Sequence, residues 1–353
     1  MPYHYACAVS ASDLRPTTGP AAPQVSRGAA RISVCLIVNP AAGGGRAGRA
    51  APGVVAALRA RGLEVRREDT RDLDHARELA LEAARREELA VTLGGDGLAG
   101  AAADALRAVP GSILGVLPGG RGNDLARVLG IGQNPIAACA VIAGGVAREL
   151  DLGLVGEHTF VGIASCGFDS DANRIANEAP SWLGNLVYAY GALRTLLAWR
   201  PARFELVLDG QRHTFTGYSV GAANSKAYGG GMYAAPDALL DDGLLDVPYV
   251  EQISKLRFLT RILPKVFKGT HVHEPAVHVL RGRELQITAD RPFTLYADGD
   301  PIGELPLRVS VLPAAVRVLV PADSPLGSTG RARDGGPRDV GADTAARPSS
   351  NGP

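Results

Sequence analysis

The chain has 353 residues, and at roughly 100–200 residues per domain this length suggests two domains. Apolar residues make up 46% of it, which excludes a disordered or fibrous chain. Its 37 basic and 36 acidic side chains leave a net charge of +1, so we expect no nucleic acid as a partner.

The cysteine pattern and the lengths of the apolar runs indicate the cellular compartment of the protein. The four cysteines are scattered and form no CxxC pair, which argues against a disulfide scaffold or a structural zinc site and fits a reducing compartment. There is no signal-peptide pattern, and no apolar run approaches the roughly 20 residues that span a bilayer. We expect a cytoplasmic protein, with any membrane contact peripheral and at the inner face. Oligomeric state cannot be read from the sequence, and a homodimer is one possible state.

Residues 1–30 carry Pro, Ala, Ser and Thr without periodicity and are predicted to form a flexible arm. The segment that follows alternates β-branched runs with helical spacing. We predict strands at 32–38, 63–67, 89–93 and 113–117, and helices at 46–61, 72–88 and 98–108. Strands that alternate with helices predict a Rossmann-like α/β domain over 31–150, with a parallel sheet covered on both faces.

The pattern changes near Asp151, where short strands are joined by turns such as Leu208-Asp209-Gly210. We predict strands at 159–164, 203–208, 213–220, 285–289, 293–297 and 316–320, and helices near 172–200 and 251–268. These elements predict a β-sandwich-like domain over 151–321, whose last strand can return to the first domain. Residues 322–353 are rich in Gly, Pro, Asp, Arg and Ser, which predicts a disordered tail.

Three glycine-rich turns each follow a predicted strand. They are Asn39-Pro40-Ala41-Ala42-Gly43-Gly44-Gly45, Gly94-Gly95-Asp96-Gly97 and Pro118-Gly119-Gly120-Arg121-Gly122-Asn123-Asp124. Such turns can be nothing more than tight connections, but glycine also lets backbone N–H groups approach a phosphate. Because the carboxyl ends of parallel strands share one sheet edge, the three turns can converge on one crevice.

The turns match neither the P-loop pattern GxxxxGK[ST] nor GxGxxG after the first strand. A phosphate site without a P-loop lysine needs a cation. Asp96, Asp124 and Asp151 are candidate magnesium-side ligands, since Mg²⁺ prefers one or two carboxylates together with water and phosphate oxygens.

Taken in order, these motifs resemble the diacylglycerol kinase catalytic-domain family, in its soluble bacterial branch related to sphingosine kinases. The set comprises Asn39-Pro40, GGDG at 94–97, PGGRGNDLAR at 118–127, Asp151-Leu152-Gly153, Gly167-Phe168-Asp169, AAPDALLDDGLLDV at 234–247 and Asp298-Gly299-Asp300. The match covers residues 31–320. NAD kinases resemble the chain only near the second turn, and their later Asn-Asn-Glu element is not found in the sequence.

The resemblance implies an NAD kinase/diacylglycerol kinase-like fold and a lipid kinase that transfers the γ-phosphate of ATP to a diacylglycerol-like or sphingoid-like hydroxyl. It implies a nucleotide site whose members are Asn39, Pro40, Ala41, Ala42, Gly43, Thr70, Gly94, Gly95, Asp96, Gly97, Arg121 and Asn123. It also implies an aspartate network of Asp96, Asp124 and Asp151 that acts through water and Mg²⁺.

Two further implications concern acidic residues of the second domain. Asp241 and Asp242 fall in a loop that holds a second, structural magnesium in some bacterial members of the family. Asp300 falls where the family has a glutamate general base, so the implied catalytic residues are Asp300 and Asp96. Asp298 and Asp300 also fit an ordinary hairpin turn.

The sequence departs from the family pattern at three residues that would contact the nucleotide or the substrate hydroxyl. Leu98 and Arg121 stand where the family has threonine, which removes two hydroxyl groups near the nucleotide. The planar fork of Arg121 can meet phosphates directly in their place. Asp300 is one methylene shorter than glutamate, so it can reach a substrate hydroxyl only if the backbone lies closer.

Two apolar stretches are candidates for contact with lipid. Residues 181–200 have helical spacing and can line an acyl-chain pocket or form an ordinary core helix. Residues 254–269 carry five basic side chains and no acid, so they can dock on anionic lipid or pack as a solvated helix that Pro264 kinks. Two other functions stay open: a kinase of NAD or another non-lipid alcohol, and a lipid- or nucleotide-binding protein with weak catalysis.

Overall fold

The computed structural model of the protein describes residues 32–168, 170–171, 175 and 187–326. The terminal segments predicted as an arm and a tail lie outside these residues, except for 322–326. Asp169 and residues 181–186 also lie outside the described residues.

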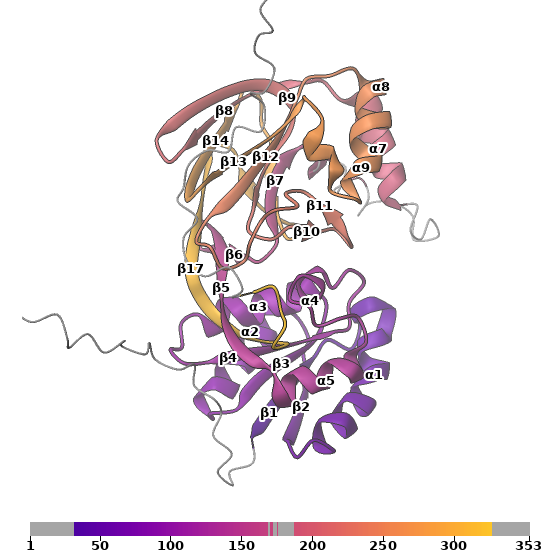
Figure 1. The fold of residues 1–353 in the computed structure, drawn as a ribbon, viewed down its shortest axis with the longest axis vertical. Coiled ribbons are helices and arrows are strands. Elements are labelled where there is room, and N and C mark those ends of the chain that lie inside the picture. Colours follow the sequence, from indigo (N-terminus) through magenta and orange to yellow (C-terminus); the bar gives the residue numbers. More distant parts are fainter. Residues whose placement is uncertain (1–31, 169, 172–174, 176–186, 327–353) are drawn as a thin grey trace, which may run out of the picture. The chain divides into compact units, whose positions relative to one another are not determined.

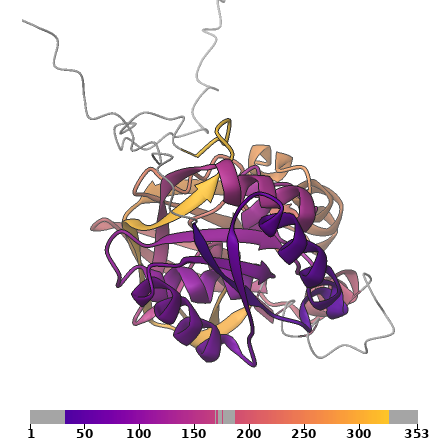
Figure 2. The same cartoon turned by 90° about the horizontal axis from the view of Figure 1, so that it is seen from below.

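The N-terminal half is a parallel sheet flanked by helices, as predicted. Strands β2, β1, β3 and β4 pair in that order, all parallel, and the helix pairs α1–α5 and α2–α3 cover opposite faces (Figures 1 and 2). Its elements are β1 (Ser33–Val38), α1 (Ala42–Arg59), β2 (Glu64–Asp69), α2 (Leu73–Arg85), β3 (Leu89–Gly94), α3 (Asp96–Leu106), β4 (Ile113–Pro118), α4 (Asp124–Val128), α5 (Pro135–Gly144) and β5 (Val146–Val155).

Local sequence explains how these elements begin and how they pack. The Asp72 carboxylate accepts a hydrogen bond from His75 N (2.7 Å) and caps α2, and Asn134 caps α5 in the same way, with Pro135 in the first turn. Strands β1, β3 and β4 are buried almost throughout, because helices cover both of their faces. Strand β2 is charged at every residue except Val65 and forms the edge of the sheet, where charge discourages pairing with another chain.

The C-terminal half is dominated by antiparallel strands around a second core, which confirms the predicted β-rich domain. Its elements are β6 (His158–Phe160), β7 (Ile163–Gly167), α7 (Val187–Ala198), β8 (Ala202–Leu208), β9 (Gln211–Ala223), β10 (Ala227–Tyr228), β11 (Met232–Tyr233), β12 (Leu245–Glu251), α8 (Lys255–Arg257), the π-helical turn η2 (Phe258–Ile262), α9 (Leu263–Val266), the 3-10 turn η3 (Thr270–His273), β13 (Val277–Gly282), β14 (Glu284–Ala289), β15 (Thr294–Ala297), β16 (Asp300–Glu304) and β17 (Leu307–Val320). Aromatic side chains fill this core: Phe168 meets Trp199 edge-on and Tyr218 stacks on Phe258.

Strand β17 belongs to both halves of the structure. Its first part pairs with β14, and its last part pairs in parallel with β4, so the final strand joins the N-terminal sheet. Strand β5 pairs with β17 along its length, and the register shifts between Leu312 and Val316. At this bulge Ala314 has a φ of 50°, and its N–H donates to Asp151 Oδ1 (2.7 Å). A buried carboxylate on β5 therefore holds the bulge.

Several predicted elements differ from those observed, for local reasons. Strands β5, β12, β13 and β16 are missing from the sequence-based prediction, because charged residues interrupt the apolar pattern of β5, β12 contains Pro248 and β16 reads as a turn. The helix predicted over 251–268 is shorter and changes type, since Pro264 lacks an N–H and a π-helical turn precedes it. Among the described residues, no helix is both long and apolar enough to span a membrane.

The contact between β5 and β6 leaves no room for a side chain at Gly153. A Cβ there would lie 2.0 Å from Cζ of the buried Phe160. We expect Gly153→Ala to lower the free energy of unfolding by ~2 kcal/mol through overpacking, as measured by urea denaturation. Gly100→Ala, in helix α3 with its nearest new neighbour at 3.8 Å, is the control and should stabilise by ~0.5–1 kcal/mol. Equal stability of the two variants would contradict this packing.

Candidate active site

The three glycine turns converge, as predicted from their places at strand ends. The N–H groups of Gly119 and Gly120 both donate to Gly94 O, at 2.7 and 2.8 Å. A Cβ at Gly120 would lie only 2.3 Å from Gly95 Cα, and one at Gly43 would lie 2.6 Å from Gly119 O. Only glycine allows this approach of bare backbone, so the second and third turns stack directly and the first turn adjoins them.

A fourth glycine loop joins the site from the C-terminal half. Gly229, Gly230 and Gly231 lie between β10 and β11, and all three have positive φ. Gly230 N donates to Asp124 Oδ2 (2.7 Å), and a Cβ at Gly122 would lie 3.2 Å from Gly230 Cα. Our sequence analysis missed this loop, although three successive glycines next to Met232 were a visible signal.

The predicted nucleotide residues divide into exposed and structural ones. Pro40, Ala41 and Arg121 are exposed, so their atoms are accessible to a ligand. The Asn123 side chain is buried instead: its Oδ1 accepts from Gly120 N (2.7 Å) and its Nδ2 donates to Gln133 Oε1 (3.0 Å). Thr70 is also buried, and its hydroxyl donates to Asp72 O (2.5 Å). Asn123 therefore shapes the third turn, and Thr70 holds the start of α2.

Arg46 brings positive charge to the turns, and sequence reasoning missed it. Residues 43–45 have positive φ, so α1 takes up helical geometry at Arg46. The Arg46 guanidinium donates to Gly120 O and lies about 3 Å from where a Cβ of Gly43 would be. It therefore lies where the first and third turns meet. The residue gave no motif signal because it follows the glycines rather than lying among them.

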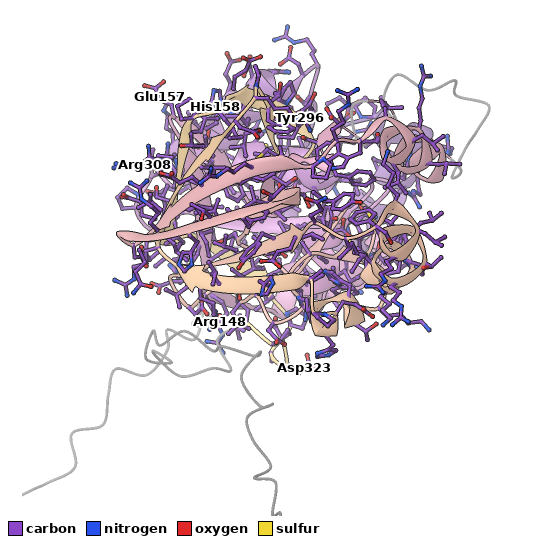
Figure 3. All side chains as sticks on the ribbon, turned by 90° about the horizontal axis from the view of Figure 1, so that it is seen from above. Arg148, Glu157, His158, Tyr296, Arg308 and Asp323 are labelled. Atoms are coloured by element: carbon purple, nitrogen blue, oxygen red, sulfur yellow. The ribbon has the colours of Figure 1, made fainter. Side chains whose placement is uncertain are left out.

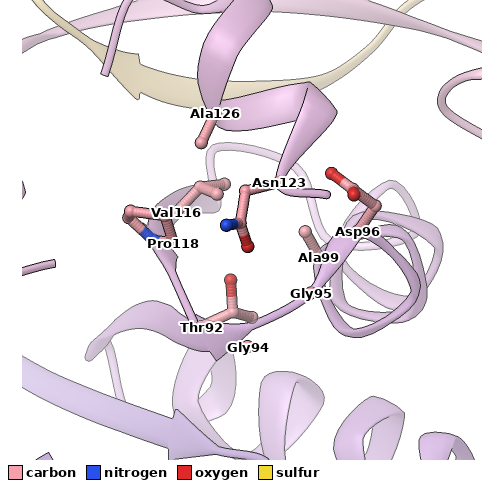
Figure 4. Close-up of a pocket in the computed structure, with 9 residues that line it drawn as sticks. All are labelled: Thr92, Gly94, Gly95, Asp96, Ala99, Val116, Pro118, Asn123 and Ala126. Atoms are coloured by element: carbon pink, nitrogen blue, oxygen red, sulfur yellow. The ribbon is translucent and has the colours of Figure 1, made fainter. Parts of the chain in front are cut away.

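Asp96 lies at the start of α3 beside a small hollow of about 10 Å³, room for roughly one water molecule. Figure 4 shows the Thr92 hydroxyl and the Asn123 amide facing this hollow, with Asp96 near them. Asp96 is half-buried and accepts from Leu125 N (2.9 Å). Desolvation raises the pKa of Asp96, the backbone hydrogen bonds oppose that rise, and the nearby charge of Asp124 adds to it.

Asp124 and Asp151, the other predicted network members, are buried and hydrogen-bonded to protein. Asp124 pairs with Arg127 and accepts from Gly230 N. Asp151 accepts from Ala314 N and Gly243 N, both at 2.7 Å, and burial raises its pKa. Across the described residues no three His, Cys, Asp or Glu side chains are arranged to enclose a metal. The donors fit a magnesium ion held by Asp96, water and phosphate oxygens, not an all-protein cage.

The acidic loop predicted as a second magnesium site carries its own cation. The Arg281 guanidinium pairs with Asp242 and, through Nε, with Asp246 Oδ1 at 3.1 Å. Both carboxylates are nearly buried, and desolvation raises the pKa of Asp246 to about 6 although Arg281 opposes the rise. Asp241 is half-buried beside them. An arginine 39 residues away along the chain thus neutralises Asp242.

Asp298 lies in the turn between β15 and β16, and Asp300 follows directly after this turn. Asp300 is exposed at the first position of β16, so its carboxylate is accessible. Asp298 has a φ of 49°, and its carboxylate accepts from the backbone N–H groups of 161, 162 and 163 at 2.7, 2.8 and 3.1 Å. Although the residue as a whole is exposed, desolvation of this carboxylate raises the pKa of Asp298 to about 6, and the charge of Asp96 acts in the same direction. Val161, which donates to Asp298, has its Cγ2 3.8 Å from where a Cβ of Gly100 would be. Gly100 lies one turn after Asp96 on α3, so the turn before Asp300 lies near Asp96.

A larger pocket, of about 340 Å³, lies beside the end of α7. Trp199 and Phe293 supply its aromatic wall, and the Arg291 guanidinium lies over both rings, 5.1 and 4.8 Å from their centroids. Thr195 Oγ1 and Trp199 Nε1 are buried at this pocket and have no hydrogen-bond partner among the described residues. Near the end of the 181–200 stretch, Trp199 therefore belongs to the second core and also lines the pocket.

Comparisons with known proteins agree with this arrangement. The sequence profile of the diacylglycerol kinase catalytic domain matches residues 33–155, and that of the YegS C-terminal NAD kinase beta sandwich-like domain matches 162–320. A diacylglycerol kinase of Mycobacterium tuberculosis is 35% identical over 298 residues, covering 82% of this chain and 95% of that protein. The Bacillus subtilis diacylglycerol kinase is 30% identical, covering 71% and 83%. The chain therefore belongs to the diacylglycerol kinase family of lipid kinases.

Two further similarities concern the wider family and the fold. A protein of Enterobacter sp. named "Probable lipid kinase YegS-like" is 31% identical, covering 68% of this chain and 80% of that protein. The crystal structure of a diacylglycerol kinase from Bacillus anthracis str. Sterne superposes with a TM-score of 0.64 at 20% identity, covering 82% of this chain and 97% of the other. This last likeness confirms the fold, with an α/β domain followed by an antiparallel one.

Removing the Arg281 guanidinium should leave two nearly buried carboxylates without a counter-charge. We expect Arg281→Ala to lower the free energy of unfolding by ~3 kcal/mol at pH 8, measured by urea denaturation. The loss should be smaller at pH 5. A carboxyl group whose pKa is raised in the folded state destabilises the fold above that pKa, and protonation relieves this cost as the pH falls. The pKa of Asp246 is already about 6 with Arg281 present and should rise further without it.

Arg283→Ala, at a neighbouring exposed residue, is the matched control and should change stability by no more than ~0.5 kcal/mol at either pH. A loss for Arg281→Ala that is the same at pH 5 and pH 8 would contradict the role given to Asp246.

Proposed function

We propose that the protein is an ATP-dependent lipid kinase that transfers the γ-phosphate of ATP to a lipid hydroxyl, with a diacylglycerol-like or sphingoid-like acceptor. The observation that supports this most strongly is the stacking of glycine turns at the sheet edge, with Asp96 among them and the Asp298–Asp300 turn nearby. Membership in a family of lipid kinases supports the reaction class.

The phosphates of ATP would lie against the glycine turns. Backbone N–H groups at the start of α3 suit an anion, because the helix dipole and unpaired amides both favour negative charge there. Arg46, at the junction of the first and third turns, adds a fixed positive charge, and the exposed Arg121 adds a second. Asn39 and residues 40–43 would form the edge of the nucleotide site.

Asp96 would hold magnesium together with water and the phosphate oxygens, with Asp124 close enough to influence it electrostatically. When bound, magnesium neutralises charge on the phosphates. Asp124 and Asp151 would contribute by position: Asp124 fixes the Gly229–Gly231 loop over the site, and Asp151 fixes the β17 bulge.

In the chemical step the lipid hydroxyl oxygen would attack the γ-phosphorus, and the bond to the β-phosphate oxygen would break as ADP leaves. The Asp300 carboxylate would accept the hydroxyl proton. Asp298 would hold the turn in place through its three hydrogen bonds to residues 161–163. The pocket beside α7, with Trp199 and Phe293 in its wall, would accept part of the lipid.

The test is transfer of label from γ-labelled ATP to a total lipid extract in mixed micelles, followed by extraction into the organic phase. We expect labelled lipid from the wild type and at least a hundredfold loss of kcat in Asp96→Asn and Asp300→Asn. Asp300→Glu should stay active because it keeps a carboxylate that can accept the proton. Asp323→Asn, at an exposed residue in the turn after β17 (Figure 3), is the control.

Each of the other outcomes has a distinct meaning. Label in a water-soluble product would point to a non-lipid alcohol as acceptor. ATP binding without turnover would make the protein a binding protein. Full activity in both Asp variants would refute the site assignment while leaving the reaction intact.

Arg46 offers a test of the nucleotide site alone. We expect Arg46→Met to raise KM for ATP about tenfold with a smaller effect on kcat, since it removes a charge that meets the phosphates before and during transfer. Arg59→Met, an exposed arginine at the far end of α1 that donates to Val65 O, is the control. An unchanged KM in the Arg46 variant would contradict the assignment.

A further inference from the structure

Exposed apolar side chains gather on one surface of the C-terminal half. Within the described residues, five of the seven large hydrophobic side chains that are exposed lie on α7 or in the segment from α8 to Phe267, the residue after α9. We call this surface the apolar ridge; its members are Leu193, Leu197, Leu256, Leu259 and Phe267, exposed by 39–72%. Single exposed apolar residues are ordinary, but such a cluster marks an interaction surface.

The two parts of the ridge are neighbours in space. The Lys255 ammonium group donates to Leu197 O (2.8 Å) and so ties α8 to the end of α7, and Figure 1 shows α7 beside α8 and α9. Phe258 stacks on Tyr218 and meets Phe168 edge-on, which anchors the π-helical turn to the aromatic core. In the segment from α8 to α9, the ridge is therefore the outer face, and the inner face is packed against the aromatic core.

The inner face fully accounts for the packing of this segment. Phe258 and Ile262 are 1% and 2% exposed and belong to the second core. Leu256, Leu259 and Phe267 are not needed there and point away from it. Of the two interpretations given to residues 254–269, packing of one face is confirmed, and it leaves a second apolar face uncovered.

Positive charge surrounds the apolar ridge. Lys255, Arg257, Arg261, Lys265 and Lys268 lie on the same segment as three of its members, and the segment has no acidic residue. Lys265 pairs with Glu274, whereas Arg257, Arg261 and Lys268 have no ion pair within the described part of the chain. Protein partners and second copies of a chain cover apolar faces as well, but an excess of one charge around such a face suits an anionic surface.

We propose that the apolar ridge and its basic rim dock the protein on an anionic phospholipid bilayer. The leucine and phenylalanine side chains enter the boundary between headgroups and acyl chains, and the arginine and lysine groups meet the phosphates. Each basic residue near such a surface contributes about fivefold in binding, or ~1 kcal/mol. Ala198 and Trp199, which directly follow Leu197, line the pocket beside α7, so docking brings this pocket close to the lipid. The inference does not depend on catalysis.

The test is sedimentation of the full chain with vesicles of phosphatidylcholine alone or mixed with phosphatidylglycerol, in the absence of ATP. We expect binding to the mixed vesicles, weakened by salt. Combined Arg257→Gln, Arg261→Gln and Lys268→Gln substitutions should weaken it at least tenfold. Combined Leu256→Ser, Leu259→Ser and Phe267→Ser substitutions should weaken it similarly. All six sites are exposed, so the fold should be retained.

Matched controls remove the same kinds of group elsewhere. Ile136→Ser changes an exposed apolar residue on α5, and combined Arg61→Gln, Arg85→Gln and Arg308→Gln substitutions remove three remote charges. Arg308, labelled in Figure 3, lies on β17 and pairs with Glu284 (3.3 Å), far from α7. Both controls should bind vesicles like the wild type.

Failure of the wild type to bind mixed vesicles, or equal binding by the ridge variants and the controls, would overturn the proposal. Loss of a dimer in the ridge variants, with vesicle binding unchanged, would assign the ridge to a second copy instead. Phosphorylation of a detergent-dispersed acceptor is the separate readout for the proposed kinase activity. A wild type that phosphorylates this acceptor without binding vesicles would refute docking alone.

Discussion

The site depends on contact between bare backbones at the carboxyl edge of the parallel sheet. The carbonyl of Gly94 accepts N–H groups from both Gly119 and Gly120, and this is possible only because no Cβ stands between the turns. The stacked turns keep their remaining backbone N–H groups at one place, where Arg46 also lies. The hydrogen bond from Gly230 to Asp124 then connects this edge to the C-terminal half. The proposed phosphate binding thus rests on glycine content and sheet topology together.

The aspartates of the chain divide by what already occupies their oxygens. Asp151, Asp124 and Asp298 accept backbone N–H groups from segments distant in sequence, so they position loops and strands. Asp96 also accepts one backbone N–H group, from Leu125, but it is half-buried, and Asp300 is exposed, which leaves both accessible to a cation or a substrate. The motifs of the family therefore contain more carboxylates than the proposed chemistry needs, because most of these carboxylates hold loops and strands in position. This division also separates stability, which the first group supports, from the proposed turnover, which would depend on the second.

The features that sequence predicted well are local ones. Strands ending in glycine turns are visible as patterns, and right-handed crossovers then bring these turns to one edge. Features that depend on distant pairs were not predictable. Arg281 neutralises Asp242 across 39 residues, and Asp298 is anchored by residues about 135 positions earlier. No periodicity distinguishes a carboxylate that awaits a metal from one that already holds an arginine. Likewise, the apolar ridge could be recognised only once Phe258 and Ile262 were known to fill the inner face.

The central claim is that stacking of the glycine turns creates the nucleotide site, and calorimetric titration with ATP and magnesium tests it most directly. The account predicts one nucleotide bound per chain, with affinity at least tenfold weaker in Gly120→Ala, whose Cβ would lie 2.3 Å from Gly95 Cα. Gly100→Ala, within α3, should bind like the wild type. Equal affinity in Gly120→Ala, with the fold intact by circular dichroism, would contradict the account.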